Sequence, residues 1–365
     1  MRYFDCNFFC RAVCRWLLSV CFLTLTNLAQ LDQSNIWALE NNPVRLAMTT
    51  SSAGLNSIPQ TQPPDAEDRS SVKTDSDCND QIWLVSTRHL SNPSRNTMEF
   101  PNFSLQRYEA RSTWQDSSLD DFIESEDPNA VTIFWVHGNQ VDSVSAKQRG
   151  MTVYRNLAAS SQQDRPVRMV IWSWPSSQIR RHLKDVRVKA QRTNLQALYL
   201  AQFLVRLSEE SQVSLTGFSL GGRVVTGALH LVAGGTLSGR QLSPGAAKPG
   251  NFRVVLYAPA IHNDWLLPGK PHQLAMSMVD GAMLMNNDCD PILKRYRFIT
   301  KCGNPKALGY AGLAGIHKLG EIKERVQQWN VCRLVGKTHD LLSYLSNGSI
   351  MNRTRRYVFW DPLDI

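Results

Sequence analysis

The sequence lacks the features that would indicate a zinc site or a bundle of membrane-spanning helices. None of its 8 cysteines stands in a C-x-x-C pair, so a zinc site is not indicated. The apolar run at residues 16–28, WLLSVCFLTLTNL, is too short to predict a transmembrane helix. Charged residues make up 19% of the 365 positions, slightly below the usual level, and no internal repeat is evident. What remains is a chain whose 42% hydrophobic content can build one large α/β domain or two small ones.

Basic residues outnumber acidic ones, which gives a formal net charge of +9 at pH 7. Such a balance can attract nucleic acid, but the Lys and Arg residues are scattered along the chain. The densest group, RRHLK at residues 180–184, continues through Arg187, Lys189 and Arg192 without interleaved aromatic residues. We therefore interpret it as a solvated loop and helix face, and expect no nucleic-acid partner.

The N-terminal 78 residues differ in composition from the rest. Arg2, Arg11 and Arg15 precede the short apolar run, which is the pattern of a secretory signal. We predict a signal peptide or N-terminal anchor at residues 1–29, with the protein exported to the periplasm or the extracellular space, or associated with the membrane through an uncleaved segment. Residues 30–78, rich in Ser, Thr, Asn, Gln and Pro, are predicted to form a disordered linker. The folded domain is expected at residues 79–350, followed by a tail at 351–365.

Export would allow disulfide bonds in the body of the chain. The cysteines outside the N-terminal segment are Cys78, Cys289, Cys302 and Cys332. Four cysteines allow three connectivities, of which a Cys302–Cys332 bond is one example, and the sequence cannot choose among them.

Strand-like and helix-like patterns alternate along the body of the chain. Strands are expected at residues 81–87, 105–114, 131–136, 167–172, 213–216, 252–257, 282–287 and 329–334. Helices are expected at residues 145–160, 185–207, 221–233 and 340–345. This alternation implies βαβ crossovers, and hence an α/β fold with a mostly parallel central sheet and helices on both faces.

The stretch at residues 212–235, QVSLTGFSLGGRVVTGALHLVAGG, is the most informative part of the sequence. It reads as strand, sharp turn and helix, with G-x-S-x-G at Gly217, Ser219 and Gly221 in the turn. A serine on so tight a turn needs small neighbours, because larger side chains would collide with the strand and the helix. The motif predicts a nucleophilic Ser219, and the amide of Leu220 at the helix start can donate to an oxyanion.

A nucleophilic serine needs a base to take its proton. In an open parallel sheet the reactive groups gather at the carboxyl ends of the strands, and His339 follows the last expected strand. It also follows the serine in the chain order Ser, acid, His. His339 is therefore our first choice, and His317, which no strand precedes, is our second.

The base in turn needs an acid that fixes its tautomer. Asp288 and Asp290 both follow the strand expected at residues 282–287, and we favour Asp290. Asp264, after the preceding strand, is a further alternative, because some proteins of this architecture draw their acid from that position. One member of the Asp288 and Asp290 pair could instead only cap the turn before Pro291.

The oxyanion site needs a second amide beside that of Leu220. His137, Gly138 and Asn139 follow the buried strand at residues 131–136, where such a loop is expected. Gly138 permits close approach of the backbone, so the Asn139 amide is the favoured donor and its side chain can assist. His137 is interpreted as a residue that shapes the loop and not as a base.

Several of these segments together resemble the α/β-hydrolase superfamily, and more narrowly a bacterial family of esterase-like and lipase-like serine hydrolases of unknown function. The matching segments are QIWLVSTR (81–88), FWVHGN (134–139), SWPS (173–176), GFSLGG (217–222), NDCDPILK (287–294), ALGYAG (307–312) and THDLLSYL (338–345). The resemblance implies an α/β-hydrolase fold and a Ser219, Asp290 and His339 triad. The family often has Ala-Pro-Asp after the strand at residues 252–257, whereas this chain has Ala260 in place of the aspartate, which weakens Asp264 as the acid.

The sequence therefore predicts an exported serine hydrolase that cleaves a small-molecule or lipid-like carboxylic ester through an acyl-enzyme. This chemistry requires no metal ion and no organic cofactor. Trp172 and Trp174 could line the substrate pocket or belong to the core. Two alternatives stay open: a non-catalytic binding or surface protein on the same scaffold, and an amide or thioester hydrolase with the same triad.

Overall fold

The computed structural model describes residues 79–90, 100–109, 113–158, 165–243, 251–299 and 303–363. The strands are β1 (Gln81–Ser86), β2 (Ser104–Glu109), β3 (Thr113–Ser117), β4 (Val131–Val136), β5 (Val167–Ser173), β6 (Val213–Phe218), β7 (Phe252–Tyr257), β8 (Val279–Asn286) and β9 (Val326–Asn330). The α-helices are α3 (Leu119–Glu124), α4 (Ser143–Ala158), α5 (His182–Leu204), α6 (Leu220–Val232), α7 (Leu308–Ala311), α8 (Cys332–Val335), α9 (Leu341–Leu345) and α10 (Gly348–Val358). Three 3-10 helices are η1 (Ala275–Met278), η2 (Leu293–Ile299) and η3 (Ile316–Arg325).

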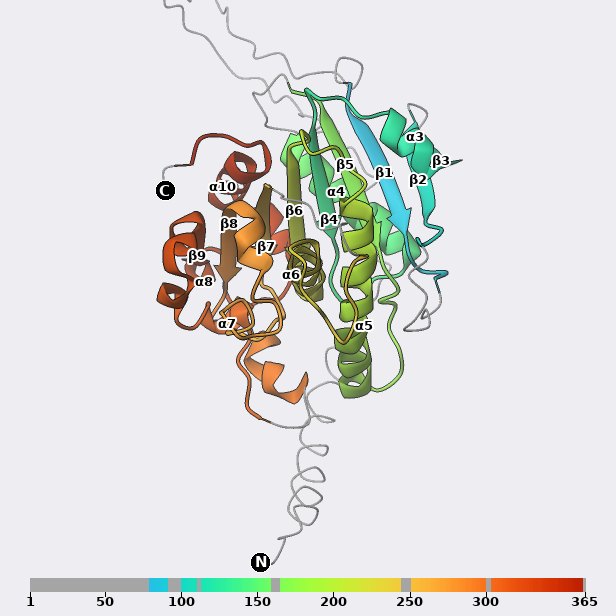
Figure 1. The fold of residues 1–365 in the computed structure, drawn as a ribbon. Helices are drawn as coiled ribbons and strands as arrows, with labels where there is room; N and C mark the ends of the chain where they lie inside the picture. Colours follow the sequence, from blue (N-terminus) through green and yellow to red (C-terminus); the bar gives the residue numbers. More distant parts are fainter. Residues whose placement is uncertain are drawn as a thin grey trace, which may run out of the picture. The chain divides into compact units, whose positions relative to one another are not determined.

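The strands form one sheet in the order β3-β2-β1-β5-β4-β6-β7-β8-β9. Within the described residues only β2 runs against the others, because it pairs antiparallel with both β1 and β3, while every other pairing is parallel. The parallel strands therefore end at the same edge of the sheet, at the bottom of Figure 1. We call this the C-terminal edge. The central strand β6 lies between β4 and β7, so the residue that follows it sits in the middle of that edge.

Helices cover both faces of the sheet, and the alternation of side chains along the strands shows which helix covers which face. On β5, the Trp172 ring packs against Phe203 of α5 at 5.7 Å, while its neighbour Ile171 lies against Gly150 of α4. Strands buried on both faces need apolar residues at nearly every position. All residues of β4, β5, β6 and β7 are buried, including the polar ones that interrupt their mostly apolar sequences.

The C-terminal residues belong to the packed domain, which corrects the predicted boundary at residue 350. Helix α10 begins at Gly348 with Asn347 as its N-cap and continues to Val358. Its side chains Ile350, Met351, Thr354, Tyr357 and Val358 are buried. The Thr354 hydroxyl lies 3.0 Å from the Tyr257 hydroxyl of β7, and the Ser214 hydroxyl of β6 donates to the Val358 carbonyl at 2.9 Å. Residues 351–358 are therefore part of one layer of the fold and not a tail.

Two strand predictions also need correction. The single strand expected at residues 105–114 is two antiparallel strands, β2 and β3, in which Tyr108 pairs with Trp114. The last strand is β9, which begins at Val326, three residues before the predicted start. It is an edge strand with the polar sequence VQQWN, and the apolar residues that suggested a strand at 331–334 form α8 instead.

The order of strands, the two helical layers and the central strand–turn–helix at β6 and α6 are those of an α/β-hydrolase fold, which confirms the fold predicted from the sequence. No helix of the described residues is both long enough and apolar enough to cross a membrane. The predicted signal peptide or anchor and the predicted linker, residues 1–78, lie outside the described residues.

Candidate active site

Ser219 lies in the sharp turn between β6 and α6. Its φ of 54° and ψ of −118° are strained for a residue with a side chain. The end of β7 holds this turn in place. The Ser219 N–H donates to the Tyr257 carbonyl at 3.0 Å, and the Ala260 N–H donates to the Ser219 carbonyl at 2.9 Å. Hydrogen bonds to the end of β7 thus hold the strained backbone of Ser219 in this conformation.

The two glycines of the motif are required because there is no room for a side chain at either position. A Cβ atom on Gly221 would lie 2.0 Å from the Val136 carbonyl oxygen, and a Cβ atom on Gly217 would lie 2.8 Å from the Gly222 nitrogen. Both obstacles are backbone atoms, which cannot move aside without displacing β4 or α6. This is the physical reason for the spacing of G-x-S-x-G in this chain.

The structure brings Ser219, His339 and Asp290 together in one chain of hydrogen bonds. His339 Nε2 lies 2.9 Å from Ser219 Oγ, and His339 Nδ1 lies 2.5 Å from Asp290 Oδ2. Asp290 is fully buried, and its other oxygen accepts the backbone N–H groups of Ile292 at 2.8 Å and Leu293 at 2.9 Å. With Oδ1 so occupied, the carboxylate presents Oδ2 to the histidine in a fixed direction.

The remaining surroundings of His339 restrict its ring. The ring centroid lies 5.1 Å from that of Phe218, the residue directly before the serine, and Phe218 in turn packs edge-on against Tyr344. Burial and the nearby Asp290 carboxylate raise the pKa of Tyr344. The phenol therefore stays neutral and adds no second negative charge beside the carboxylate.

Gly138 lies directly beside the serine. A Cβ atom at this position would be 3.2 Å from the Ser219 Cβ atom and 3.2 Å from the Phe218 carbonyl oxygen, so a side chain would crowd the space next to the hydroxyl. Leu220 is the first residue of α6, and its N–H is one of those that have no partner inside a helix. The expected role for the Asn139 side chain needs correction, because its Nδ2 donates to Asp185 Oδ2 at 2.7 Å. This contact turns the side chain toward Asp185, so the backbone amide is the favoured donor.

His137 is a structural residue, as its place in the loop predicted. Its ring stacks on Trp174 at 5.5 Å with an interplanar angle of 9°, and it is 1% exposed. The Trp174 N–H donates to His137 Nε2 at 3.2 Å, so Nδ1 carries the proton and donates to the Gly138 carbonyl at 2.9 Å. Burial lowers the pKa of His137 to about 3. Trp172 and Trp174 are themselves fully buried and belong to the core, so they do not line an open pocket.

Arg88 is a residue of this site to which the sequence gave no role, although it ends the segment QIWLVSTR. Its Nε donates to Ser173 Oγ at 2.7 Å, and its Nη2 donates to the carbonyls of Val141 and Asp142, both at 3.0 Å. These contacts join the ends of β1 and β5 to the loop that carries Gly138. An arginine immediately after a buried strand at this edge was the signal that could have identified it.

The alternative acids and base lie elsewhere. The exposed Asp288 carboxylate accepts from Asn330 Nδ2 at 2.7 Å, and Asp264 pairs with Lys270 at 2.8 Å beside a surface groove. His317 is exposed on η3. Among the described residues, hydrogen bonds connect His339 and Asp290, and none of these three alternatives, to Ser219.

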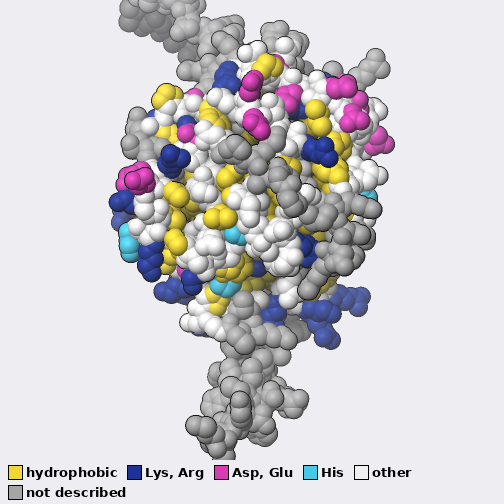
Figure 2. All heavy atoms as spheres, viewed as in Figure 1, with side chains coloured by type: hydrophobic (Ala, Val, Ile, Leu, Met, Phe, Trp, Pro, Cys, Tyr) yellow, Lys and Arg dark blue, Asp and Glu magenta, His cyan; other side chains and the backbone are white. Residues whose placement is uncertain are grey.

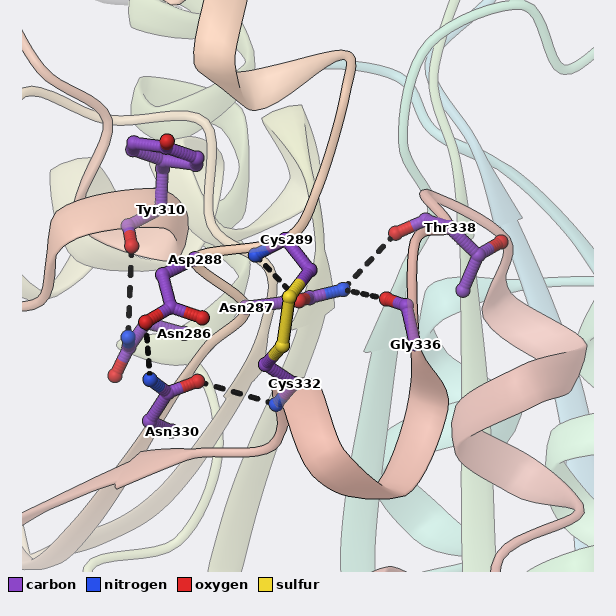
Figure 3. Close-up of a disulfide and its surroundings, with 9 residues drawn as sticks. All are labelled: Asn286, Asn287, Asp288, Cys289, Tyr310, Asn330, Cys332, Gly336 and Thr338. Carbon is purple, nitrogen blue, oxygen red and sulfur yellow. Dashed lines mark hydrogen bonds between the residues drawn. A yellow bond between two sulfur atoms is a disulfide. The ribbon is translucent and has the colours of Figure 1, made fainter.

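A disulfide joins Cys289 to Cys332 (Figure 3). The sequence left the pairing open, and the structure pairs Cys332 with Cys289 and not with the example partner Cys302, which lies outside the described residues. Asp288 and the two sulfur atoms lie within 4.8 Å of one another, but both sulfurs are used in the disulfide. The bond thus serves a structural purpose and leaves no thiolate to hold a metal ion.

The disulfide ties together the two segments that carry the acid and the base. Cys289 directly precedes Asp290, and Cys332 begins α8, which leads to His339. Figure 3 shows the side chain of Asn287 reaching across the same gap, where its Nδ2 donates to the carbonyls of Gly336 at 2.9 Å and Thr338 at 3.1 Å. One covalent bond and two hydrogen bonds therefore fix the separation between these loops.

The basic stretch at residues 180–192 is solvated only in part. Arg180, Arg181 and Lys184 are exposed, as predicted. Lys189, in contrast, is 1% exposed and pairs with the fully buried Asp185 at 3.1 Å. Burial raises the pKa of Asp185, but hydrogen bonds from Ile179, Asn139 and Lys189 outweigh it and leave the pKa below its ordinary value. This ion pair braces the Asn139 side chain and was missed because Lys189 was assigned to the solvated face.

No protein-family model matches the chain, and no curated protein matches its sequence. Similar solved structures include esterase B from Lactobacillus rhamnosis, with 14% identity, a TM-score of 0.36, and 78% of this chain and 85% of that chain covered. Carboxyl esterase 2 from the fungus Tuber melanosporum has 12% identity and a TM-score of 0.32, with 74% and 90% covered. A bifunctional GH43-CE protein from Bacteroides eggerthii has 12% identity and a TM-score of 0.35, with 65% and 32% covered, so this chain spans about a third of its length. Similarities this distant assign no residue and no reaction to this chain.

Proposed function

We propose that the protein is a serine hydrolase that cleaves carboxylic esters through an acyl-enzyme. Ser219 is the nucleophile, His339 the general base and then the general acid, and Asp290 the residue that orients His339. The observation that carries the proposal is the continuous path from Asp290 Oδ2 through both nitrogens of His339 to Ser219 Oγ, with separations of 2.5 and 2.9 Å. The 2.9 Å separation between His339 Nε2 and Ser219 Oγ is within the range for proton transfer, and the shorter contact with Asp290 holds the ring in that position.

The protonation states follow from this path. Asp290 Oδ1 accepts from two backbone N–H groups, which leaves Oδ2 to accept the hydrogen bond from His339 Nδ1–H. His339 Nε2 then has a free lone pair, to which the Ser219 hydroxyl donates. In the acylation step, Ser219 Oγ attacks the ester carbonyl while His339 takes the hydroxyl proton. His339 then returns that proton to the departing alcohol, and in the second half water repeats the sequence and releases the acid.

The negative charge that develops on the carbonyl oxygen needs donors that are already in place. We propose the backbone amides of Leu220 and Asn139 for this role. The close approach of Gly138 to Ser219 supports it, because a substrate held on the serine must pass over this loop. The Arg88 and Asp185 contacts hold the loop from both sides, so the donors need not reorganise during the reaction.

Labelling of the full chain with a fluorophosphonate tests the nucleophile, and hydrolysis of short-chain p-nitrophenyl esters tests the reaction. Labelling should disappear in Ser219→Ala, and the rate in His339→Ala should fall by about four orders of magnitude or more. Ser143→Ala, an exposed serine at the same edge, should label like the parent chain.

Two further controls decide between candidate residues. Asp290→Asn should lose about 10⁴ in kcat, whereas Asp288→Asn and His317→Ala should retain most of the activity. An anilide and a thioester of the same acyl group are measured beside the ester, because the same triad can cleave all three. If the folded parent chain takes up no fluorophosphonate, the proposal is refuted and a non-catalytic protein on this scaffold is favoured.

A further inference from the structure

The exposed apolar side chains of the domain are confined to one place. Among the described residues, all the large apolar side chains that are exposed lie in segments that follow the carboxyl ends of β4, β5, β8 and β9. These residues are Val144, Ile179, Leu183, Ile292, Phe298, Leu334 and Leu342. Single exposed apolar residues are normal on a protein surface, but their restriction to one edge is not. The opposite edge of the sheet has none among the described residues.

Two members of this apolar set lie in the segments that carry the candidate acid and base. Ile292 comes two residues after Asp290, and Leu342 comes three residues after His339. Their exposed fractions, 58% and 55%, are well above the level at which a side chain merely packs at the rim of a core. Leu183 and Phe298 belong to neighbouring segments, because Arg187 of α5 donates to the Phe298 carbonyl at 3.1 Å. The start of α5 and η2 both lie at the C-terminal edge in Figure 1.

Basic side chains occupy the same segments. The exposed lysines and arginines there are Arg180, Arg181, Lys184, Lys294, Arg295, Arg297, Arg333 and Lys337. In the segments directly after β4, β8 and β9 the exposed carboxylates are Asp142, Asp288 and Asp340, of which the first accepts from the Ser145 N–H and the second from Asn330. Asp120 and Asp121 are also exposed and follow the end of β3. In Figure 2, dark blue side chains gather toward the lower end of the molecule, while most visible acidic side chains lie in the upper half. The C-terminal edge therefore carries both exposed apolar side chains and an excess of positive charge.

We propose that the C-terminal edge docks onto a lipid surface that carries anionic headgroups, and that the ester substrate reaches Ser219 from that surface. Apolar side chains that enter the headgroup region and basic side chains that contact anionic lipids are the two signals that stable peripheral binding needs. Long Lys and Arg side chains can reach the headgroups while their aliphatic stems lie beside the apolar residues. The statement about the substrate rests on the proposed function, whereas the statement about docking does not.

The arrangement favours a lipid surface over an acidic protein. The apolar residues are spread over four segments of the chain, on α4, α5, η2, α8 and α9 and in the turns before α5 and η2, and do not form the face of a single element. A fluid surface adapts to such a dispersed set, and it can also deliver an acyl chain to a serine at the same edge of the sheet. Protein partners usually require a contiguous, shaped patch.

Docking is measured with the full chain carrying Ser219→Ala, so that it does not depend on hydrolysis. Vesicles of phosphatidylcholine alone are compared with vesicles that contain an equal part of phosphatidylglycerol, in a flotation assay at low and high salt. We expect binding to the anionic vesicles and a marked loss of it at high salt. Arg180→Glu with Lys184→Glu should weaken binding by about twentyfold or more, since each basic residue near an anionic surface contributes about 1 kcal/mol.

The matched control makes the same change of charge at the opposite edge. Arg206 and Lys323 are exposed and lie just before the starts of β6 and β9, so Arg206→Glu with Lys323→Glu should retain binding. For the apolar part, Leu183→Gln with Phe298→Gln should reduce binding about tenfold. Leu183→Ile with Phe298→Leu should keep it.

The results of these binding experiments distinguish among the partners that could bind the C-terminal edge. Equal binding by all variants would assign docking to the apolar run at residues 16–28 and overturn the proposal. Absence of binding to anionic vesicles would overturn it in favour of an acidic protein partner. With Ser219 restored, the ratio of vesicle-ester to soluble-ester hydrolysis should fall in the Leu183→Gln and Phe298→Gln variant. Intact vesicle binding with no hydrolysis of either ester would instead reject the proposed function and leave the docking proposal standing.

Discussion

Replacement of Asp185 by asparagine should destabilise the fold and loosen the loop beside Ser219. Asp185 Oδ1 accepts from the Ile179 N–H at 2.9 Å and pairs with Lys189 Nζ at 3.1 Å, while Oδ2 accepts from Asn139 Nδ2 at 2.7 Å. An amide has one oxygen, so its NH₂ group would face a donor in either orientation. Lys189 would also keep a charge that is 1% exposed and has lost its counter-ion. Removal of one partner from a buried ion pair costs about 3–5 kcal/mol.

Urea denaturation at pH 7 measures this loss, and the rate of fluorophosphonate labelling reports on the loop. Asp185→Asn should lower the free energy of unfolding by about 3–5 kcal/mol and slow labelling under conditions where the variant is folded. Asp185→Asn with Lys189→Met is the matched control, because it removes both charges and should recover a large part of the stability. A loss below about 1 kcal/mol, or a double variant no more stable than the single one, would refute the reasoning about an uncompensated buried charge.

The same interaction has a defined pH dependence. The pKa of Asp185 is lowered in the folded protein, so the stability that the carboxylate contributes is present above the unfolded pKa of about 3.9 and is lost as the pH falls through the folded pKa. The difference in stability between the parent chain and Asp185→Asn should therefore be constant near neutral pH and shrink below about pH 4.

Three further predictions concern the rest of the fold. Reduction of the disulfide, or Cys332→Ser, should lower the free energy of unfolding by up to about 4 kcal/mol, the loop-entropy estimate for a sequence separation of 43, and dithiothreitol should then have no further effect on the variant. Gly221→Ala should prevent folding, because its Cβ atom would lie 2.0 Å from a backbone oxygen. Gly348→Ala is the control and should fold normally, because there is open space around that position. Soluble yield and circular dichroism compare the two variants. Burial lowers the pKa values of His137, His230 and His272, so the unfolded chain binds more protons than the folded one below about pH 6.5, and stability should fall with acidification. Each histidine contributes at most about 1.4 kcal/mol per pH unit, and in His137→Gln the slope of unfolding free energy against pH should be smaller by up to that amount.

The central part of the site could be predicted because its signals are local. The G-x-S-x-G turn can be identified because a strand pattern precedes it and a helix pattern follows it. A parallel sheet brings the segments that follow its strands to one edge. Ser219, Asp290 and His339 lie in three such segments, and the structure brings them into contact. Whether they catalyse a reaction is for the labelling experiment to decide.

The features that the sequence left open or predicted wrongly have identifiable physical causes. Cys332 could pair with any of three other cysteines, and only the proximity of the β8 and β9 ends selects Cys289. Lys189 follows a run of exposed basic residues in the sequence, yet its position on α5 turns it toward Asp185 and the protein interior. Helix α10 was predicted to be a tail, although its buried residues recur at helical spacing and pack against β6 and β7. In each case the deciding contact is with a residue distant in sequence or on the inner side of a helix.

The sequence by itself determined the central strands, the long helices, the nucleophile turn and the parallel layout, because hydrophobic periodicity and glycine spacing act over a few residues. The tertiary structure alone decided the disulfide partner, the bracing of the Gly138 loop by Arg88 and Asp185, and the gathering of exposed apolar and basic side chains at one edge. These features depend on which segments meet in space. A linear pattern cannot specify that, because each such contact joins residues whose local surroundings would suit several partners equally well.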